Sequence, residues 1–505
     1  MKYEWNEGLY QQIISDIKQN TSFCLKNKIF NIQNLPYRKK MRQVTEVYFV
    51  HPDGPYKGTK AELKKDTAYK TKKILKKEQP VAFWGDAIQQ AIDDAAAAGG
   101  GRVVIPEGIY YTGALRMKSG VDLHLEKDAV VCFIRNKENT YYPMVFTRWE
   151  GVECMNFSPF IYAMEAENIA ISGKGTLDGG ADEYNWMPWK FGYFGEADQE
   201  VLRQQLFSLA ETTEAVEHAR VFSDKISTLR PPFLQFYKSR NIRIEGVRII
   251  NSPFWEINPV LCENIDVCDI TIETDLYNND GVDPESCRNV WIRNSFFLTG
   301  DDCIAIKSGR NGDGRRIGIP SENIIIEDNH FKNGHGGVTI GSEISGGVRN
   351  VFAQNNYFNS QQLDYPIRFK TNAQRGGILE NVYVRNCQVE KAKIAVVHAD
   401  FFYEEGENGA HRPVLRNITL ENITTAGAGI ASEQPLYLKG FTDSPIQNIT
   451  LSHVVLDGVK GDNILQNLTG LCLEDVWING VRQKDMIVSA DDFGQLHAEG
   501  AIAEK

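Results

Sequence analysis

Four short polar clusters in the second half of the chain supply side chains that could do chemistry, among them aspartates, a histidine, an arginine and a lysine. The clusters are "YNNDGVD" (277–283), "GDDCIAIK" (300–307), "NGHGG" (333–337) and "RFKTN" (368–372). They contribute Asp280, Asp301, Asp302, His335, Arg368 and Lys370. Crowded carboxylates do not all ionise freely, so we expect at least one of them to have a raised pKa. A protonated acid beside an ionised carboxylate is the arrangement that cleaves a glycosidic bond.

The two cations of the last cluster indicate the kind of sugar. Arg368 and Lys370 are two residues apart, so on a strand their side chains point to the same side. There they are able to clamp a carboxylate. The whole chain has a formal net charge of −11, which repels anions at long range. A local pair of cations on such a protein therefore favours selection of an anionic sugar.

Each cluster alone has a commoner explanation. Asn, Asp and Gly are turn residues, so "NNDGVD" by itself is more often a turn than a catalyst, and "DD" beside Gly is equally ordinary. His335 is also compatible with a plain loop, and "RFKT" with a surface strand. Calcium is the rival ligand for clustered aspartates, but no twelve-residue loop of the EF-hand type is present. The order of the clusters along the chain is the stronger signal.

A ladder of short strands supplies that order. Strands of alternating apolarity open on asparagine at Asn168, Asn241, Asn264, Asn289, Asn323, Asn350, Asn381, Asn417 and Asn448. By subtraction of these positions, the steps from Asn241 onward are 23 to 36 residues, with too little helix for βαβ units. Repeats of this length stack into a solenoid. We therefore predict an all-β fold, a right-handed parallel β-helix.

The ladder also predicts where the clusters lie. By subtraction, Asp280 follows its ladder asparagine by 16 residues, Asp301 and His335 each by 12, and Arg368 by 18. Similar offsets on successive coils place all four clusters on one face of the solenoid. Four Asn-x-Thr sequences fall on or near the ladder, and we interpret at least three as strand-opening asparagines rather than glycosylation sites.

Three segments fall outside the repeat. The Ala-rich stretch 83–101 predicts an amphipathic helix that caps the N-terminal end of the solenoid, ended by three glycines. Residues 1–80 share no period with the rest and form an extra N-terminal segment without an assigned role, whereas 81–505 form the catalytic domain. An insertion at about 181–236, helix-like near 197–220, is long enough to wall off one end of a groove.

Composition excludes several classes of protein. No apolar run approaches the roughly 18 residues that cross a bilayer, and no basic stripe with aromatics indicates nucleic acid. Nine cysteines without a CxxC pair favour buried free thiols over zinc or disulfides. The basic run 57–77 is typical of a solvated helix face. No secretion signal is visible, so we expect a cytoplasmic protein or a mature periplasmic or secreted form.

The four clusters, taken in order on a β-helix, resemble the signature motifs of glycoside hydrolase family 28, the polygalacturonases. Those motifs run Asn-Thr-Asp, Gly-Asp-Asp, Gly-His-Gly and Arg-Ile-Lys, and the resemblance covers about residues 83–480. Asn279 stands where the family has Thr, and Phe369 where it has Ile. The Phe/Gly-Ala-x-Gly-Asp-Gly stretch that precedes the cap helix in the family is absent.

The resemblance implies a role for each residue in an inverting mechanism. Asp301 would be the general acid on the glycosidic oxygen, and Asp280 and Asp302 would activate the attacking water. His335 would support protonation of the acid, and Asp283 would be a supporting residue. Galacturonate would be bound by three residues, Asn278, Arg368 and Lys370. No metal and no cofactor are implied.

Four further stretches look more like the bacterial exo-acting branch of the family. They are "TRWEGVECMNFSPFIYA" (147–163), "NSPFWEINPV" (251–260), "GSEISGGVRN" (341–350) and "KTNAQRGG" (370–377). The expected activity is therefore release of galacturonate units from the non-reducing end of galacturonate-containing oligosaccharides. A related hydrolase acting on rhamnogalacturonan oligosaccharides remains the alternative, followed by a pectate lyase and a non-catalytic carbohydrate-binding β-helix.

Overall fold

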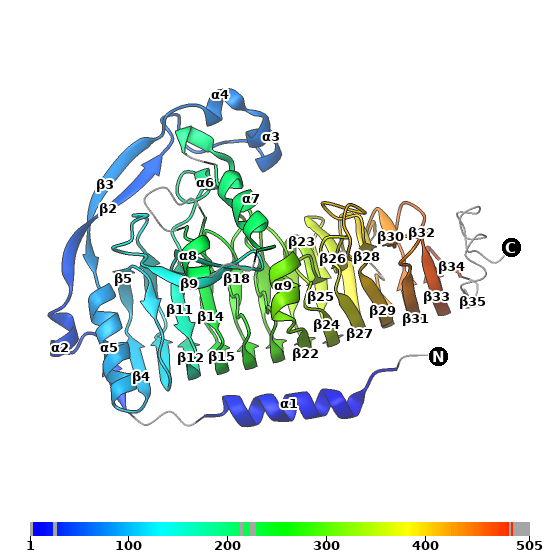
Figure 1. The fold of residues 1–505 in the computed structure, drawn as a ribbon, viewed down its shortest axis with the longest axis horizontal. Helices are drawn as coiled ribbons and strands as arrows, with labels where there is room; N and C mark the ends of the chain where they lie inside the picture. Colours follow the sequence, from blue (N-terminus) through cyan, green and yellow to red (C-terminus); the bar gives the residue numbers. More distant parts are fainter. Residues whose placement is uncertain are drawn as a thin grey trace.

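The computed structural model describes residues 4–23, 28–196, 198–212, 216–222, 229–425, 427, 429–483 and 486–487. These residues form a right-handed parallel β-helix, as the sequence predicts, with its coils stacked along the long axis of the molecule (Figure 1). Each coil contributes strands to three parallel series, joined by turns.

The first and third series run along the solenoid, whereas the second ends as separate strands at β25, which pairs with the C-terminal part of the long strand β27. The first consists of β4 (Gly101–Ile105), β7 (Val121–Leu125), β12 (Glu167–Gly173), β15 (Arg240–Glu245), β17 (Glu263–Cys268), β19 (Arg288–Arg293), β22 (Ser321–Glu327), β24 (Val348–Gln354), β27 (Ile378–Lys391), β29 (Val414–Thr424), β31 (Ile446–Leu456) and β33 (Leu468–Ile478). The second consists of β5 (Gly108–Thr112), β8 (Ala129–Phe133), β13 (Thr176–Asp178), β16 (Arg248–Ile250), β18 (Thr271–Glu273), β20 (Phe296–Leu298) and β25 (Tyr357–Asn359). The third consists of β6 (Leu115–Arg116), β11 (Ile161–Met164), β14 (Leu234–Tyr237), β21 (Ile304–Ile306), β23 (His330–Ile340), β26 (Leu363–Lys370), β28 (Ala395–Asp400), β30 (Gln434–Lys439) and β32 (Ile464–Gln466). The N-terminal part of β23 also pairs with the second series.

The asparagine ladder opens the strands of the first series and ties the coils together. All nine ladder asparagines have left-handed backbone angles, with φ between 53° and 62°, a conformation that asparagine tolerates better than other non-glycine residues. From Asn241 onward, the Nδ2 of each ladder asparagine donates to the side-chain Oδ1 of the preceding ladder asparagine, at 3.0–3.3 Å. Asn417 and Asn448, which both carry the Asn-x-Thr pattern, belong to this ladder.

The core inside the coils is built from aligned aliphatic and aromatic residues. Ile265, Val290 and Ile324 lie in register on neighbouring strands and are fully buried. Phe297, Phe331 and Phe358 stack along the second series with ring centroids 5.3 and 4.8 Å apart. Because each coil packs against its neighbours, the strands are stable only as part of the stack.

Helix α5 (Gly85–Ala97) caps the N-terminal end, as predicted. It buries Ala87, Ile88, Ala91, Ile92 and Ala95 completely against the first coil. This covers the apolar interior that the first coil would otherwise expose to water.

Residues 1–80 lie along the solenoid in two places. Helix α1 (Glu7–Thr21) runs along the outer face of the first series (Figure 1), where Tyr10, Ile13 and Ile17 pack on an apolar patch. That patch consists of Trp291, Ile325, Phe352 and Tyr383. Strand β1 (Ile29–Asn31) then pairs with β4, and helix α2 (Leu35–Arg38) follows it.

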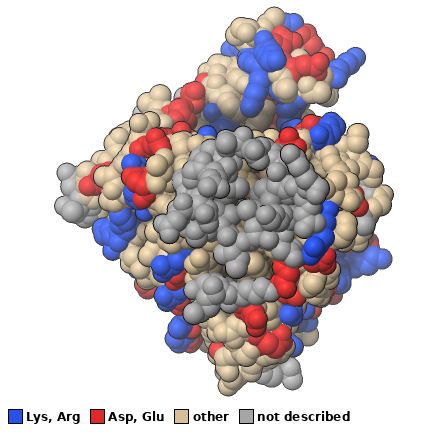
Figure 2. Space-filling view, turned by 90° about the vertical axis from the view of Figure 1, so that its right-hand side faces the viewer, with Lys and Arg blue, Asp and Glu red and all other residues tan. Residues whose placement is uncertain are grey.

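The second part is an arm that rises from the capped end. It is the antiparallel hairpin of β2 (Arg42–Val50) and β3 (Leu75–Phe83), with helices α3 (Lys60–Lys65) and α4 (Thr67–Lys70) between its strands. From the C-terminal end, the arm stands above the solenoid and carries both basic and acidic side chains (Figure 2). The arm therefore reaches over the turns of the solenoid rather than joining its coils.

The insertion lies between β13 and β14 and is helical, as expected. It contains α6 (Pro188–Phe191), a 3-10 turn η1 (Tyr193–Gly195), α7 (Glu200–Leu209) and α8 (Val216–Ala219). Two antiparallel strands, β9 (Met144–Trp149) and β10 (Val152–Phe157), lie beside it. At the other end of the solenoid, the antiparallel strands β34 (Val481–Arg482) and β35 (Met486–Ile487) pair with β33.

The eight cysteines within the described residues are all free, and most are buried, as the composition predicts. The ninth, Cys24, lies outside the described residues. None of the described helices is long and apolar enough to cross a membrane.

We expect Asn289→Ala to lower the free energy of unfolding by about 2–4 kcal/mol, because it loses two ladder hydrogen bonds and places alanine at φ 57°. Asn289→Gly is the matched control, since glycine tolerates this φ but makes no ladder bond. Thermal and denaturant unfolding should rank wild type above Gly and Gly above Ala. Equal stability of the two variants would show that the backbone angle contributes nothing.

Candidate active site

The third series brings the four polar clusters onto consecutive coils. Val282, Ile304, Val338 and Ile367 are aligned as neighbours across this series. Backbone bonds run through the site as well, since Gly281 N donates to Asp302 O at 3.0 Å and Cys303 N donates to Gly336 O at 2.7 Å. The predicted constellation is therefore formed by the register of the strands.

Two glycines of the motifs are required by close contacts. A Cβ atom on Gly300 would lie 1.8 Å from the Leu276 carbonyl oxygen. On Gly336 it would lie 2.0 Å from Thr339 Oγ1 and 2.7 Å from Asp302 Oδ1. The glycines therefore let the coils pack closely around the carboxylates.

Asp302 is completely buried between two cations. Lys370 Nζ lies 2.6 Å from Asp302 Oδ2, and Arg368 Nη1 lies 3.1 Å from Oδ1. Burial alone would raise the pKa of Asp302, but the charges of Lys370 and Arg368 outweigh it and lower the pKa. Asp302 is therefore an ionised carboxylate. Arg368 keeps its Nε buried without a hydrogen-bond partner among the described residues.

Asp301 is paired with His335 at the edge of the site. His335 Nδ1 lies 3.0 Å from Asp301 Oδ1, and the imidazole is half exposed to solvent. The charge and hydrogen bond of Asp301 raise the pKa of His335 to about 9. Burial opposes ionisation of Asp301, but His335, Lys370 and Arg368 together lower its pKa. At neutral pH the proton of this pair therefore resides on the imidazole.

Asp280 is the carboxyl group with the raised pKa that crowding predicts. Burial raises its pKa well above the ordinary value, and Asp283 and Asp301 raise it further. Its only nearby cation among the described residues is Lys307, whose Nζ lies 3.5 Å from Asp280 Oδ2. Burial and Asp302 likewise raise the pKa of Asp283, against the opposing charge of Lys307. The pKa of Asp280 is thus raised and that of Asp302 lowered, although the resemblance to family 28 implies that both activate the attacking water.

Lys307 is a buried residue of the site that sequence reasoning left without a task. Its ammonium contacts three carboxyl groups, at 3.2 Å from Glu343, 3.5 Å from Asp280 and 3.7 Å from Asp283. Burial disfavours its charge, but Asp283, Glu343 and Asp280 raise its pKa well above the ordinary value. Lys307 lies in the "CIAIK" half of the second motif, where it resembles an ordinary strand residue. Its position near Asp280 follows from the pairing of Lys307 with Glu285 on the neighbouring coil.

Asn278 lies beside the candidate catalytic residues, but its side chain is held by the protein. Arg230 Nη2 donates to Asn278 Oδ1 at 2.8 Å, and Arg230 Nη1 donates to the carbonyl of Tyr277 at 3.1 Å. Arg230 is fully buried. It belongs to the end of the insertion, and no motif marks it in the sequence.

A cavity of about 860 Å³ opens beside His335 and Gly300. One wall is formed by coil residues, among them Tyr277, Asn333 and Asp364. The opposite wall is formed by residues 58–61 and Lys64 of the N-terminal arm, and Lys60 Nζ pairs with Asp275 Oδ1 at 2.6 Å. The arm therefore forms part of the candidate active site. The sequence does not predict this, because residues 1–80 contain no repeat from which their position could be inferred.

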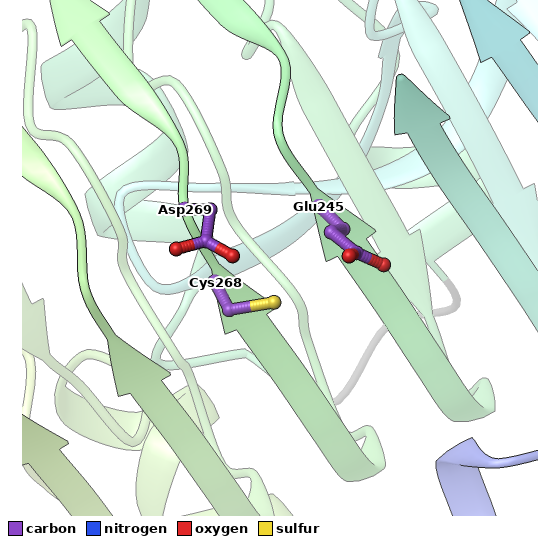
Figure 3. A group of neighbouring side chains, drawn as sticks. All are labelled: Glu245, Cys268 and Asp269. Atoms are coloured by element: carbon purple, nitrogen blue, oxygen red, sulfur yellow. The ribbon is translucent and has the colours of Figure 1, made fainter. Parts of the chain in front are cut away.

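Within the described residues, two groups of side chains have the composition of a metal site. Asp280, Asp301 and Asp302 offer oxygens within 4.8 Å of one another, but each already faces a protein cation, so they are balanced without a metal. Glu245, Cys268 and Asp269 lie at adjacent ends of β15 and β17 (Figure 3). Burial raises the pKa of the Cys268 thiol to about 12, which keeps it from being the thiolate that binds metals.

Comparison with known proteins agrees with the geometry. The model of glycosyl hydrolases family 28 matches residues 221–474. The crystal structure of a hyperthermoactive exopolygalacturonase from Thermotoga maritima is 34% identical, with a TM-score of 0.80 over 95% of this chain and 98% of that one. The family 28 exopolygalacturonase of Yersinia enterocolitica, at 19% identity and a TM-score of 0.61 over 80% of this chain and 79% of its own, shares the fold.

Two further relatives match at the level of sequence. An exo-poly-alpha-D-galacturonosidase from Dickeya chrysanthemi is 29% identical over 404 residues, which are 75% of this chain and 65% of the Dickeya protein. A probable polygalacturonase from Vitis vinifera is 26% identical over 392 residues, which are 73% of this chain and 70% of that protein. All of these are proteins to which the chain is similar.

We expect Lys307→Met to lower the free energy of unfolding by about 3–5 kcal/mol, because it leaves buried carboxyl groups without their shared cation. The exposed Lys332→Met is the control and should leave the unfolding temperature unchanged. Differential scanning calorimetry at neutral pH measures both. A Lys307→Met protein as stable as wild type would contradict the ion-cluster assignment.

Proposed function

Because the chain belongs to glycosyl hydrolase family 28, we propose that it hydrolyses the α-1,4-galacturonosidic bonds of pectin-derived galacturonides, releasing units from the non-reducing end. The observation that carries this proposal is the site itself. An ionised Asp302 held by Arg368 and Lys370 lies beside the Asp301–His335 pair and a buried, protonated Asp280.

Asp301 acts as the general acid. In the free enzyme the proton of the pair resides on His335, because His335, Lys370 and Arg368 lower the pKa of Asp301. A substrate carboxylate that approaches Arg368 and Lys370 offsets two of these charges, so the pKa of Asp301 rises on binding. The proton then passes to Asp301 and on to the glycosidic oxygen as the bond to the anomeric carbon breaks.

Asp302 acts as the base. Its lowered pKa keeps it ionised, so it accepts a proton from water as the water oxygen bonds to the anomeric carbon. Asp280, protonated by burial and by its acidic neighbours, orients that water by hydrogen bonding. The two residues have different roles because the pKa of Asp302 is lowered whereas that of Asp280 is raised.

The stereochemical outcome is inversion, as in the family. The oxygens of Asp280, Asp301 and Asp302 approach within 4.8 Å, closer than the roughly 6.5–9.5 Å usual between the carboxyl groups of inverting glycosidases. Inversion is therefore supported by membership of the family, and the distance between the carboxyl groups does not support it. NMR of the first product tests it, since hydrolysis of an α-linked substrate with inversion yields the β-anomer before mutarotation.

The exo mode is supported by the elements around the groove. Helix α6 of the insertion lies against the motif that contains Asp280, since the rings of Phe191 and Tyr277 are 4.8 Å apart. The N-terminal arm forms a wall of the cavity beside His335. Together they narrow the groove beside the catalytic groups, which favours binding of a chain end over binding of an internal segment.

Two other activities share this fold and remain outcomes of the product assay. A rhamnogalacturonan hydrolase would release products only from the alternating backbone, and a pectate lyase would leave an unsaturated sugar that absorbs in the ultraviolet. Chromatography of the products from defined oligogalacturonides and rhamnogalacturonan oligosaccharides separates the three. Free galacturonate from oligogalacturonides is the expected result, and an ultraviolet-absorbing product would overturn it.

We expect Asp301→Asn to reduce kcat by about 10²–10⁴-fold, the range typical of a lost general acid. The affinity for oligogalacturonide, measured by calorimetry, should remain within a few-fold of wild type because the clamp is intact. A variant with wild-type turnover would refute the acid assignment.

The rate should also fall as pH rises through about 9. Because the pKa of His335 is raised to about 9, the imidazole carries its proton below that pH and loses it above. The pH profile of kcat/KM reports this ionisation in the free enzyme. His335→Asn should have a lower kcat/KM at every pH and should show no further decrease above pH 9. An unchanged decrease above pH 9 in His335→Asn would show that another group causes it.

A further inference from the structure

Lys190 is a cation without an anionic partner among the described residues. It is the third residue of helix α6 of the insertion and is only partly exposed. Among the described residues, no carboxylate forms an ion pair with its ammonium group. Glu150, the acidic group whose charge acts on it most strongly, is instead bonded to Arg203 at 2.8 Å and lies 3.8 Å from Arg310.

Arg230 is a second cation without a carboxylate partner in the part of the chain that the structure describes. There its guanidinium bonds to neutral groups, namely the Asn278 and Gln199 side chains, the carbonyls of Pro253 and Tyr277, and the sulfur of Met187. Burial lowers the pKa of Arg230 to about 9. A fully buried cation without an opposite charge is costly for a protein to hold.

These two cations lie beside the motif that contains Asp280. The ring of Phe191, which follows Lys190 in helix α6, lies 4.8 Å from the ring of Tyr277. Arg230 Nη2 donates to Asn278 Oδ1 at 2.8 Å. Burial lowers the pKa of Lys190, and the charges of Arg230 and Arg203 lower it further, whereas Glu150 and Asp301 raise it. Both cations therefore lie next to the polar clusters of the candidate active site.

The cations of the site form two groups along the solenoid axis. Lys190 and Arg230 lie on the N-terminal side of the coil that bears Asp301 and Asp302. Arg368 lies on the C-terminal side, two coils further along, where Thr339 aligns with it. Adjacent coils are about 4.8 Å apart, so the two groups lie on either side of the bond to be cleaved.

We propose that Lys190, supported by Arg230, binds the carboxylate of the sugar at the non-reducing end, while Arg368 and Lys370 bind that of the next sugar. This inference rests on the proposed function and adds a specificity determinant and a binding direction to it. The bound carboxylate supplies the negative charge that Lys190 and Arg230 lack. The terminal sugar then lies toward the capped end, and the remainder of the chain extends over the C-terminal coils.

The test compares two substrates that differ only at the terminal sugar. One is trigalacturonate, and the other is the same trisaccharide with its non-reducing residue reduced to galactose. Wild type should prefer the acid substrate by about 10- to 100-fold in kcat/KM, as expected for a hydrogen bond to a charged group. Lys190→Met should lose this preference, and Lys190→Arg should retain most of it.

Two controls separate recognition from folding. Lys174→Met, an exposed lysine in the turn between β12 and β13, should behave as wild type. Calorimetric binding of the two trisaccharides in the Asp301→Asn background measures the same preference without turnover, and Lys190→Gln serves as a second neutral variant. Unfolding temperatures within a degree or two of wild type exclude misfolding.

The outcomes are distinguishable from failure of the proposed function. If wild type releases nothing from trigalacturonate, the proposed function itself is wrong. If wild type is active but Lys190→Met still prefers the acid terminus, or loses activity equally on both substrates, the assignment of Lys190 is overturned.

Discussion

The register between parallel coils is the constraint on which the whole site depends. The backbone bonds from Gly281 to Asp302 and from Cys303 to Gly336 join the coils that carry the catalytic groups, and the side-chain amides of the asparagine ladder repeat this alignment on the first series. A slip of one residue on any coil would turn its side chains to the other face. Asp302 would then leave the reach of Arg368 and Lys370. Catalytic geometry in this protein is therefore a property of the stack, and no single strand or loop possesses it.

Burial of charge in this frame explains how similar carboxyl groups come to differ. Asp280 and Asp302 are both buried and both lie near Asp301, but Asp302 has two direct cations whereas Asp280 has one that it shares with Asp283 and Glu343. As a result, the pKa of Asp302 is lowered and the pKa of Asp280 is raised. Desolvation acts on every group in the cluster, so the number and distance of the cations determine the sign of each pKa shift.

The sequence predicts the repeating part of this molecule well because every coil needs the same turn at the same place. Each ladder asparagine marks a left-handed turn that few residue types tolerate, so Asn264 or Asn323 locates a coil. A similar, though not identical, offset along the coil then locates Asp280 or His335. The same logic fails where no repeat exists. Residues 1–80 offer no offset, so the arm beside the active site is invisible in the sequence. Arg230 and Lys190 lie in a non-repeating insertion, and Lys307 alternates like any strand residue. The distribution of protons depends on distances between coils, which no single motif contains.

Three non-repeating parts, the cap helix, the arm and the insertion, start from the N-terminal coils, and this asymmetry gives the groove a direction. The cap helix, the arm and the insertion all lie toward the N-terminal coils (Figure 1), whereas the C-terminal coils beyond Arg368 continue as regular strands β28, β30 and β32. An unmodified β-helix has a groove that is equivalent along its length and binds the interior of a polymer. Adding a wall on one side of the catalytic coil leaves room for a short segment there and for a long one on the other side. The choice between end and interior cleavage thus resides in the insertions, while the chemistry of bond cleavage resides in the repeat.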